Sequence, residues 1–255
     1  MKKFPNHPIR TRFAKNIVAE VLFPEKQTGK IAILAMGIPS SLDKKDILQF
    51  LASRGYVAIF PRYRGTWESE GNFLEISPAL DIRDIIEELG KKHSLQDLFT
   101  GATKPVRVSA IHLFGSSFGG AAVLLNSSLP LVKKIVALSP VIDWKADSQS
   151  EPFPFFVAFT ASAFGDAFRT KRPKDWQKLI ATDFYNPIGH TSSIAGKKIF
   201  IIHARDDTIV PYEPLFPFAE KTHAAYYLKP RGGHLGLSHL SHRFYWKKID
   251  AFLKS

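Results

Sequence analysis

Short apolar runs alternate along the chain with segments whose apolar residues recur every three or four positions. The apolar runs predict strands over residues 16–23, 30–36, 56–60, 106–114, 134–138, 198–203 and 224–228. The helical spacing is formed by Leu42, Ile47, Leu48 and Leu51, by Ile82, Ile85, Ile86 and Leu89, and by Trp246, Ile249, Phe252 and Leu253. Strands that alternate with helices in this way predict a mostly parallel sheet with helices on both faces.

This alternation stops between Asp143 and Thr191. The segment is rich in aromatic residues, namely Phe153, Phe155, Phe156, Phe159, Phe164, Phe168 and Trp176. It is too long for an ordinary connection between two elements of a sheet domain. We therefore predict one domain over residues 1–255 with a helical cap inserted at about 144–191, over the end of the sheet.

The composition is that of a globular protein, and the length of 255 residues fits one sizeable domain. No stretch approaches the roughly 20 apolar residues that a membrane span needs, so we expect none. Residues 1–8 hold two lysines but no apolar run, which makes them a poor signal peptide. The chain has no cysteine, which excludes disulfides and thiol chemistry. These features favour a cytoplasmic protein.

A net charge of +12 raises the possibility of a nucleic acid or an acidic membrane as partner. The basic residues are nevertheless scattered, in pairs such as Lys44-Lys45 and Lys133-Lys134, and no run of five occurs. A basic surface that keeps the protein soluble is the favoured interpretation, and no nucleic-acid partner is expected. The oligomeric state is left open by the sequence.

The most informative motif is G-x-S-x-G, formed by residues 115–119. It lies where the predicted strand that ends at Phe114 meets a helical segment that starts at Gly119. Such a strand-to-helix turn forces the serine into a strained conformation and exposes its hydroxyl. Ser117 is therefore the candidate nucleophile, and a serine that merely caps the helix is the alternative.

A serine hydroxyl needs a base, and the base needs an acid that orients it. Two loops that follow predicted strands, residues 203–211 and 231–236, supply candidates at the edge where open α/β sheets bind ligands. His234 lies in a glycine-flanked loop and is the candidate base, whereas His203 ends a strand and is expected to pack or bond locally. Asp206 and Asp207 both remain candidates for the acid.

The histidines at 234, 239 and 242 also suggest a metal cluster. Because no cysteine or nearby carboxylate accompanies them, a solvated final helix is favoured, and neither a metal nor an organic cofactor is expected.

Four blocks in the expected order give the chain a resemblance to the α/β-hydrolase superfamily over nearly its whole length. Residues 60–71 resemble the family's R-G-x-G-x-S-x-G stretch, residues 115–119 its nucleophile turn, residues 203–211 its H-G-x-x-D-x-x-V-P loop, and residues 233–234 its G-H. The likeness is greatest to small serine esterases and peptidase-like hydrolases, including the dienelactone-hydrolase and prolyl-oligopeptidase-related branches. It implies the α/β-hydrolase fold and Asp207 as the acid.

The chain departs from the family pattern in three places. The family's oxyanion strand commonly ends in His-Gly, whereas this chain has Met36-Gly37 before Ile38. Backbone N–H groups stabilise the oxyanion, so the resemblance implies the N–H of Ile38 together with that of Phe118. Trp67 and Ala204 stand where the family usually has glycine, and neither position belongs to the expected triad.

The resemblance implies a serine hydrolase that cleaves a small carboxylic ester through an acyl-enzyme intermediate. A thioesterase or a small acylaminoacyl peptidase of the same fold is an alternative, as is a non-catalytic protein that binds through its basic surface. Aromatic residues at the expected cap, with Trp67, Phe155 and Phe159 as pocket residues, favour an acyl or aryl group over a sugar. They also fit a packed helical layer with no role in binding.

Overall fold

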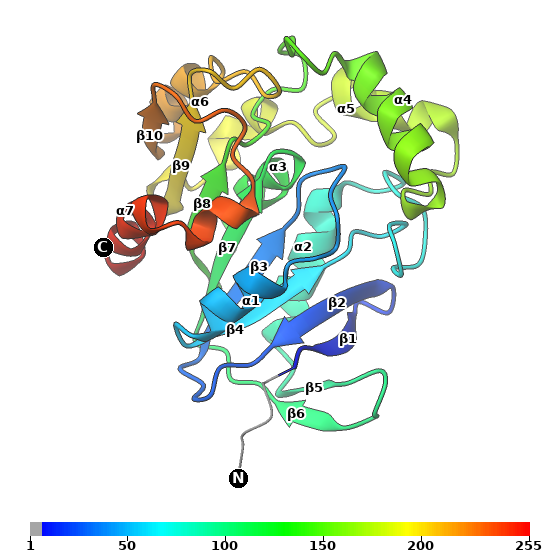
Figure 1. Cartoon of the computed structure of the whole chain (residues 1–255), viewed down its shortest axis with the longest axis vertical. Helices are drawn as coiled ribbons and strands as arrows, with labels where there is room; N and C mark the ends of the chain where they lie inside the picture. Colours follow the sequence, from blue (N-terminus) through cyan, green and yellow to red (C-terminus); the bar gives the residue numbers. More distant parts are fainter. Residues whose placement is uncertain (1–6) are drawn as a thin grey trace.

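A twisted eight-stranded sheet runs through the middle of the computed structural model, which describes residues 7–255 (Figure 1). Its strand order is β1-β2-β4-β3-β7-β8-β9-β10. The strands are β1 (Ile9–Phe13), β2 (Ile17–Leu22), β3 (Lys30–Ala35), β4 (Tyr56–Pro61), β7 (Ala110–Ser116), β8 (Val132–Leu138), β9 (Ile199–Ala204) and β10 (Ala225–Lys229). From β4 to β10 all neighbours are parallel, which confirms the predicted mostly parallel sheet.

The sheet begins with two antiparallel pairings, β1 with β2 and β2 with β4. Strand β1 was not predicted, so the expectation that residues 16–23 form the first strand was wrong. Arg10 and Arg12 interrupt its apolar pattern, and only alternate residues of this edge strand are buried. A small separate hairpin of β5 (Ser94–Gln96) and β6 (Thr103–Pro105) was also not predicted.

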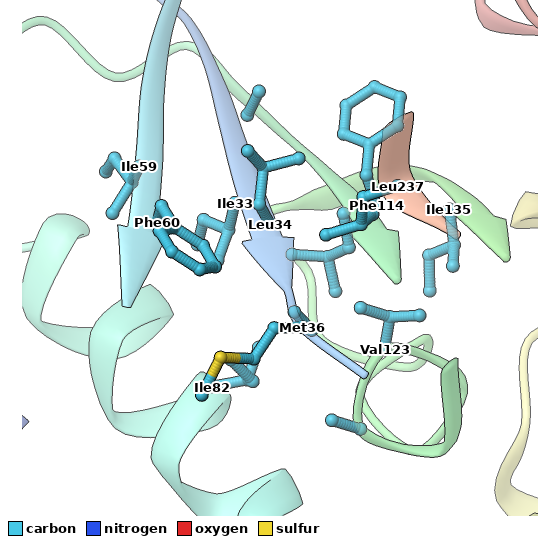
Figure 2. Packing of buried hydrophobic residues seen from close by; sticks show 14 of the residues in the cluster. Ile33, Leu34, Met36, Ile59, Phe60, Ile82, Phe114, Val123, Ile135 and Leu237 are labelled. Carbon is cyan, nitrogen blue, oxygen red and sulfur yellow. The ribbon is translucent and has the colours of Figure 1, made fainter. Parts of the chain in front are cut away.

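Helices cover both faces of the sheet, in agreement with the prediction (Figure 1). The main ones are α1 (Lys45–Ala52), α2 (Pro78–Leu89), α3 (Phe118–Leu124), α6 (Leu215–Thr222) and α7 (Arg243–Lys254). Phe50 of α1 meets Trp246 of α7 edge to face. The buried apolar residues form one continuous cluster. Figure 2 shows part of it, with strand residues such as Ile33 and Phe60 beside Ile82 of α2 and Val123 of α3.

The chain between β8 and β9 holds several short helices and no strand in residues 139–198, all of which the structure describes. They are α4 (Phe153–Phe164), η1 (Gly165–Ala167), η2 (Pro173–Gln177), α5 (Lys178–Ala181), η3 (Pro187–Ser193) and η4 (Gly196–Lys198). In Figure 1 this β8–β9 segment lies beyond the ends of β3, β7 and β8, and α4 stands out from the sheet. The segment is thus placed over the edge at which the parallel strands end.

Within residues 7–255, no helix combines the length and the apolar character that crossing a bilayer requires. Residues 1–6, on which the signal-peptide prediction partly depended, lie outside the described residues.

Candidate active site

Ser117 lies at the turn between β7 and α3, with backbone angles of φ 51° and ψ −124°. A side chain with a Cβ rarely adopts such a positive φ, so the turn is strained at this residue. The turn is held by the Ser117 N–H, which donates to the carbonyl of Leu138, and by the Ser117 carbonyl, which accepts from Gly120 and Val141. The side chain is half-buried and lines two neighbouring cavities.

The glycines that flank Ser117 allow α3 to approach the sheet closely. A Cβ at Gly119 would lie 2.1 Å from the carbonyl oxygen of Ala35 in β3, and one at Gly115 would lie 2.5 Å from the carbonyl oxygen of Gly119. Both distances are far below van der Waals contact with backbone atoms that cannot move away. The motif therefore needs glycine at these positions for packing, apart from any chemistry of the serine.

Asp207 and His234 meet at the carboxyl ends of β9 and β10. Nδ1 of His234 lies 2.9 Å from Oδ2 and 3.2 Å from Oδ1 of Asp207. Because a carboxylate can only accept, this geometry places the proton on Nδ1 and leaves Nε2 free to accept one. His234 lines one cavity together with Ser117.

The Asp207 carboxylate is buried, and burial alone would raise its pKa. Hydrogen bonds from His203 and His234, with further bonds from the N–H groups of Ile209 and Val210, outweigh burial and hold the pKa of Asp207 far below its usual range. The carboxylate is thus negatively charged at any physiological pH and can stabilise a positively charged imidazole beside it.

Asp206 has a different environment, although it is adjacent in sequence. Its Oδ1 accepts from the N–H groups of Gly232 and Gly233 at 2.7 and 2.8 Å. These backbone hydrogen bonds lower the pKa of Asp206 and tie the β9 loop to the loop that carries His234. Of the two aspartates left open by the residues alone, the structure therefore places Asp207 against His234 and Asp206 against the backbone of its loop.

His203 contacts the same carboxylate from the other side. Its Nε2 donates to the carbonyl of Val210 at 3.0 Å and lies 3.2 Å from Oδ2 of Asp207. The side chain is fully buried, and its Nδ1 has no hydrogen-bond partner among the described residues. The sequence predicted that His203 packs or hydrogen-bonds locally, but not this contact with Asp207.

Two backbone N–H groups near Ser117, those of Ile38 and Phe118, have no hydrogen-bond partner among the described residues. Phe118 is the first residue of α3, where the N–H has no intrahelical acceptor. Gly37, just before Ile38, is so close to the turn that a Cβ there would lie 3.1 Å from the Cβ of Ser117. Both groups are therefore available to a ligand at Ser117.

Two cavities meet at Ser117, and they differ in character. The first, of about 560 Å³, is lined mainly by apolar side chains, which include Phe118, Val141, Trp144, Phe153, Phe156, Ile180 and Val210. The second, of about 500 Å³, has a larger share of polar residues in its wall, which include Asp43, Lys44, Asp46, His234, Ser238 and Ser241. We call them the apolar cavity and the polar cavity. Ile38, Ser117, Glu151 and Ile209 line both.

The three pocket residues expected from the sequence lie in different places. Phe159 lines the polar cavity and is stacked on Phe155 at the exposed face of α4. Phe155 and Trp67 line neither of the two described cavities at Ser117. Trp67 instead packs against Phe164. These two positions therefore do not contact the space beside the serine.

Trp144, Phe153 and Phe156 line the apolar cavity and were not selected from the sequence. Phe156 of α4 is buried, whereas Phe155 and Phe159 of the same helix are exposed. Because Phe156 is three residues from both Phe153 and Phe159, the spacing alone does not tell which of these residues line the cavity.

Arg62 and Arg64, in the stretch after β4, are structural. Arg62 is completely buried, with its guanidinium beside the carboxylates of Glu20 and Glu68. Arg64 pairs with Asp81 and Asp84 of α2 and so anchors its loop to that helix. Neither arginine lines the described cavities at Ser117. Among residues 7–255, no group of three or more His, Asp or Glu side chains is placed to hold a metal ion.

Comparisons with known proteins agree with this fold. The family model described as the alpha/beta hydrolase family matches residues 39–244, which is most of the chain. No curated protein matches the chain by sequence.

Solved structures share its fold at low sequence identity. The esterase Pf2001 of Pyrococcus furiosus superposes with a TM-score of 0.70 at 19% identity, over 98% of this chain and 91% of the esterase. An acylaminoacyl peptidase of Pyrococcus horikoshii gives a TM-score of 0.61 at 18% identity, over 100% of this chain but 41% of the peptidase. DcsB, solved in complex with its substrate analogue, gives 0.67 at 16% identity, over 97% of this chain and 98% of DcsB. With most of its length matched by the family model, the chain belongs to the alpha/beta hydrolase family.

Proposed function

We propose that the protein is a serine hydrolase that cleaves a carboxylic ester through an acyl-enzyme intermediate, with Ser117, His234 and Asp207 as its catalytic residues. The observation that supports this most strongly is that His234, which is hydrogen-bonded to Asp207, lines the same cavity as Ser117, which occupies a strained turn. Two structural neighbours are an esterase and an acylaminoacyl peptidase, and an acyl-transfer reaction is consistent with both names.

In the proposed reaction, Nε2 of His234 takes the proton of the Ser117 hydroxyl while Oγ forms a bond to the ester carbonyl carbon. The charge that develops on the carbonyl oxygen is stabilised by the N–H groups of Ile38 and Phe118, whose hydrogen bonds are otherwise unmade. The carbon–oxygen bond to the alcohol then breaks, and His234 donates its proton to the departing oxygen. Asp207 holds His234 in the required tautomer and stabilises its cation.

Water completes the cycle by the same steps. His234 takes a proton from the water molecule, whose oxygen attacks the acyl carbon, and the bond to Ser117 breaks as Oγ recovers a proton. The products are one carboxylic acid and one alcohol, and no other reactant is needed.

We also propose that residues 144–191 of the β8–β9 segment act as the cap of this site. Trp144, Phe153, Phe156 and Ile180 from this segment line the apolar cavity. The segment is fixed to the serine turn by Tyr185, whose hydroxyl donates to the carbonyl of Phe118 at 2.8 Å. Trp144 in turn donates from Nε1 to the carbonyl of Tyr185 at 2.9 Å. The cap wall thus has a fixed position relative to the nucleophile.

The test is covalent labelling of the wild-type protein and of Ser117→Ala with a fluorophosphonate probe, combined with hydrolysis of p-nitrophenyl butyrate. We expect stoichiometric labelling and turnover in the wild type and loss of both in the variant. Ser53→Ala is a matched control, because Ser53 is an exposed serine that follows α1 and lines neither described cavity at Ser117. Turnover that survives Ser117→Ala would refute the proposed nucleophile. A wild-type protein that neither reacts with the probe nor cleaves esters would favour a non-catalytic binding role.

A further inference from the structure

The two cavities at Ser117 lie on different sides of the position that the carbonyl group of a bound ester would occupy. An ester presents an acyl group on one side of the carbonyl carbon and an alcohol on the other, and the two cavities share Ser117 and Ile38. A carbonyl group that contacts the Ser117 hydroxyl and the Ile38 N–H therefore places one half of the ester in each cavity. The question is which half each cavity receives.

The position of His234 answers this question, if His234 is the general acid of the proposed function. The departing alcohol oxygen must lie within hydrogen-bond reach of the group that protonates it. Among the described residues, His234 lines the polar cavity and is not part of the apolar cavity wall. The alcohol half therefore lies in the polar cavity, and the acyl half lies in the apolar cavity.

We propose that the substrates are esters of an apolar acid with a small polar alcohol that carries no negative charge. The acyl half contacts the aromatic wall of the apolar cavity, while the alcohol half lies between α1 and η5 (Leu237–Ser241). This inference rests on the proposed function and adds the substrate class to it.

The apolar cavity fits a hydrocarbon or aryl acyl group. Phe118, Trp144 and Phe156 lie close together in its wall, with ring centroids of Trp144 at 5.7 Å from Phe118 and 6.1 Å from Phe156. Its volume of about 560 Å³ is within the range of pockets that take whole small molecules. Its wall also contains the charged residues Asp143, Lys145, Asp147 and Glu151, beside a larger number of apolar side chains.

The polar cavity contains more negative than positive charge. Three carboxylates, Asp43, Asp46 and Glu151, line it beside one ammonium group, Lys44. The Lys44 ammonium is already bound to its own loop, where Nζ donates to the carbonyl of Ser41 at 2.6 Å and to Oγ of Ser40 at 3.2 Å. An anionic alcohol would meet this excess of carboxylates, whereas a neutral or cationic one would not be repelled.

The experiment varies the two halves of the ester independently on the wild-type protein. In the acyl series, the choline esters of acetic, butyric and hexanoic acid are compared. We expect kcat/KM to rise about fourfold per methylene group while the chain still fits, from the free energy of burying each group. The alcohol series compares butyrate esters of four alcohols. These are choline, its uncharged isostere 3,3-dimethylbutanol, glycolate, and n-octanol as a long apolar alcohol.

For the alcohol series we expect choline butyrate to exceed the glycolate ester about three- to tenfold at low ionic strength, with a smaller difference at high salt. The double variant Asp43→Asn/Asp46→Asn should reduce this ratio about fourfold. Asp250→Asn is the matched control, because Asp250 is a carboxylate on α7 that lines neither described cavity at Ser117. It should leave the ratio unchanged.

Two variants that add bulk test the assignment from the protein side. Ile180→Trp narrows the apolar cavity and should lower kcat/KM for hexanoyl esters while acetyl esters are unaffected. Ser238→Trp, at an exposed position of the polar cavity, should lower kcat/KM for larger alcohols and leave the acyl preference unchanged. Thermal unfolding of both variants shows whether they are folded, and the substrate series on the wild type does not depend on them.

Two results would overturn the assignment of the halves. One is a higher kcat/KM for n-octyl butyrate than for choline butyrate together with no gain from acetyl to hexanoyl choline, and the other is an exchange of effects between the two tryptophan variants. A glycolate ester that matches or exceeds choline butyrate would overturn the charge preference. These outcomes presuppose hydrolysis that depends on Ser117. Absence of that hydrolysis for every ester, with no probe labelling, would instead refute the proposed function.

Discussion

Replacement of the two adjacent aspartates by asparagine separates the proposed catalytic acid from its neighbour. Asp207→Asn keeps the size of the side chain and its acceptor oxygen for Ile209 and Val210. It places an amide where Oδ2 now meets Nδ1 of His234. The amide N–H₂ group would donate to Nδ1, so the imidazole proton would move to Nε2. His234 could then no longer accept the Ser117 proton.

The size of the effect follows from this exchange of tautomer. A wrong tautomer with the geometry intact lowers kcat about 10⁴-fold in a serine protease triad, which corresponds to about 5.5 kcal/mol in the barrier. We expect a loss of this order for Asp207→Asn. In Asp206→Asn the amide oxygen can still accept from the N–H groups of Gly232 and Gly233, so the His234 loop stays in place. We expect kcat to fall less than about tenfold.

The assay is steady-state hydrolysis of p-nitrophenyl butyrate by both variants, with circular dichroism and thermal unfolding to show that each is folded. Fluorophosphonate labelling rates give a second readout of nucleophile activation, and they should fall with Asp207→Asn. The reasoning would be refuted if Asp206→Asn were the inactive variant while Asp207→Asn retained activity. Equal losses in two folded variants would also contradict it.

Two further predictions concern stability. Gly119→Ala should lower the free energy of unfolding by at least about 3 kcal/mol, because its Cβ would lie 2.1 Å from the Ala35 carbonyl oxygen. Gly236→Ala is the control: a Cβ there meets open space, so the free energy of unfolding should fall by less than about 1 kcal/mol. Urea unfolding measures both values. Burial lowers the pKa of His112, which is hydrogen-bonded to Tyr56, to about 4, with repulsion from lysines adding to it. The unfolded chain, with the ordinary pKa of about 6.5, then binds more protons than the folded one, so stability falls as the pH drops from about 6.5 toward 4. At about pH 5 the free energy of unfolding should be about 2 kcal/mol lower than at pH 8 because of His112. This contribution should be absent in His112→Asn. Equal pH dependence of stability in the two proteins would contradict the assignment of the effect to His112.

The central strands were predictable because a strand that is buried on both faces is a continuous apolar run in the sequence. β3, β4, β7, β8 and β9 are apolar almost throughout, which is typical of parallel strands covered by helices. The edge strand β1 lacks a continuous apolar run because its two arginines alternate with buried residues, and Arg10 pairs with Glu20 and Glu68. Half-buried edge strands are short and polar on alternate residues, so they resemble loops.

A residue of the candidate site was predictable where a backbone requirement or a family motif fixes its identity. It was not predictable where the role of a residue depends on the direction in which its side chain points. Ser117 follows from the glycines that its turn needs. Asp206 and Asp207 are chemically identical neighbours, and the direction in which each points depends on how the two loops meet. The pocket residues required the rotation of α4, which places Phe156 inward and Phe155 outward although they are adjacent.

The net charge illustrates why a whole-chain property is a poor guide to the substrate. The chain carries +12, yet the side chains that line the two cavities at Ser117 include five carboxylates and two ammonium groups, namely Asp43, Asp46, Asp143, Asp147 and Glu151 with Lys44 and Lys145. Electrostatic interactions between exposed groups decay over about 8 Å at physiological ionic strength, so a bound ligand responds mainly to the groups that line its cavity. An anion attracted by the basic surface would therefore be bound away from Ser117, and a substrate at Ser117 would be selected against negative charge.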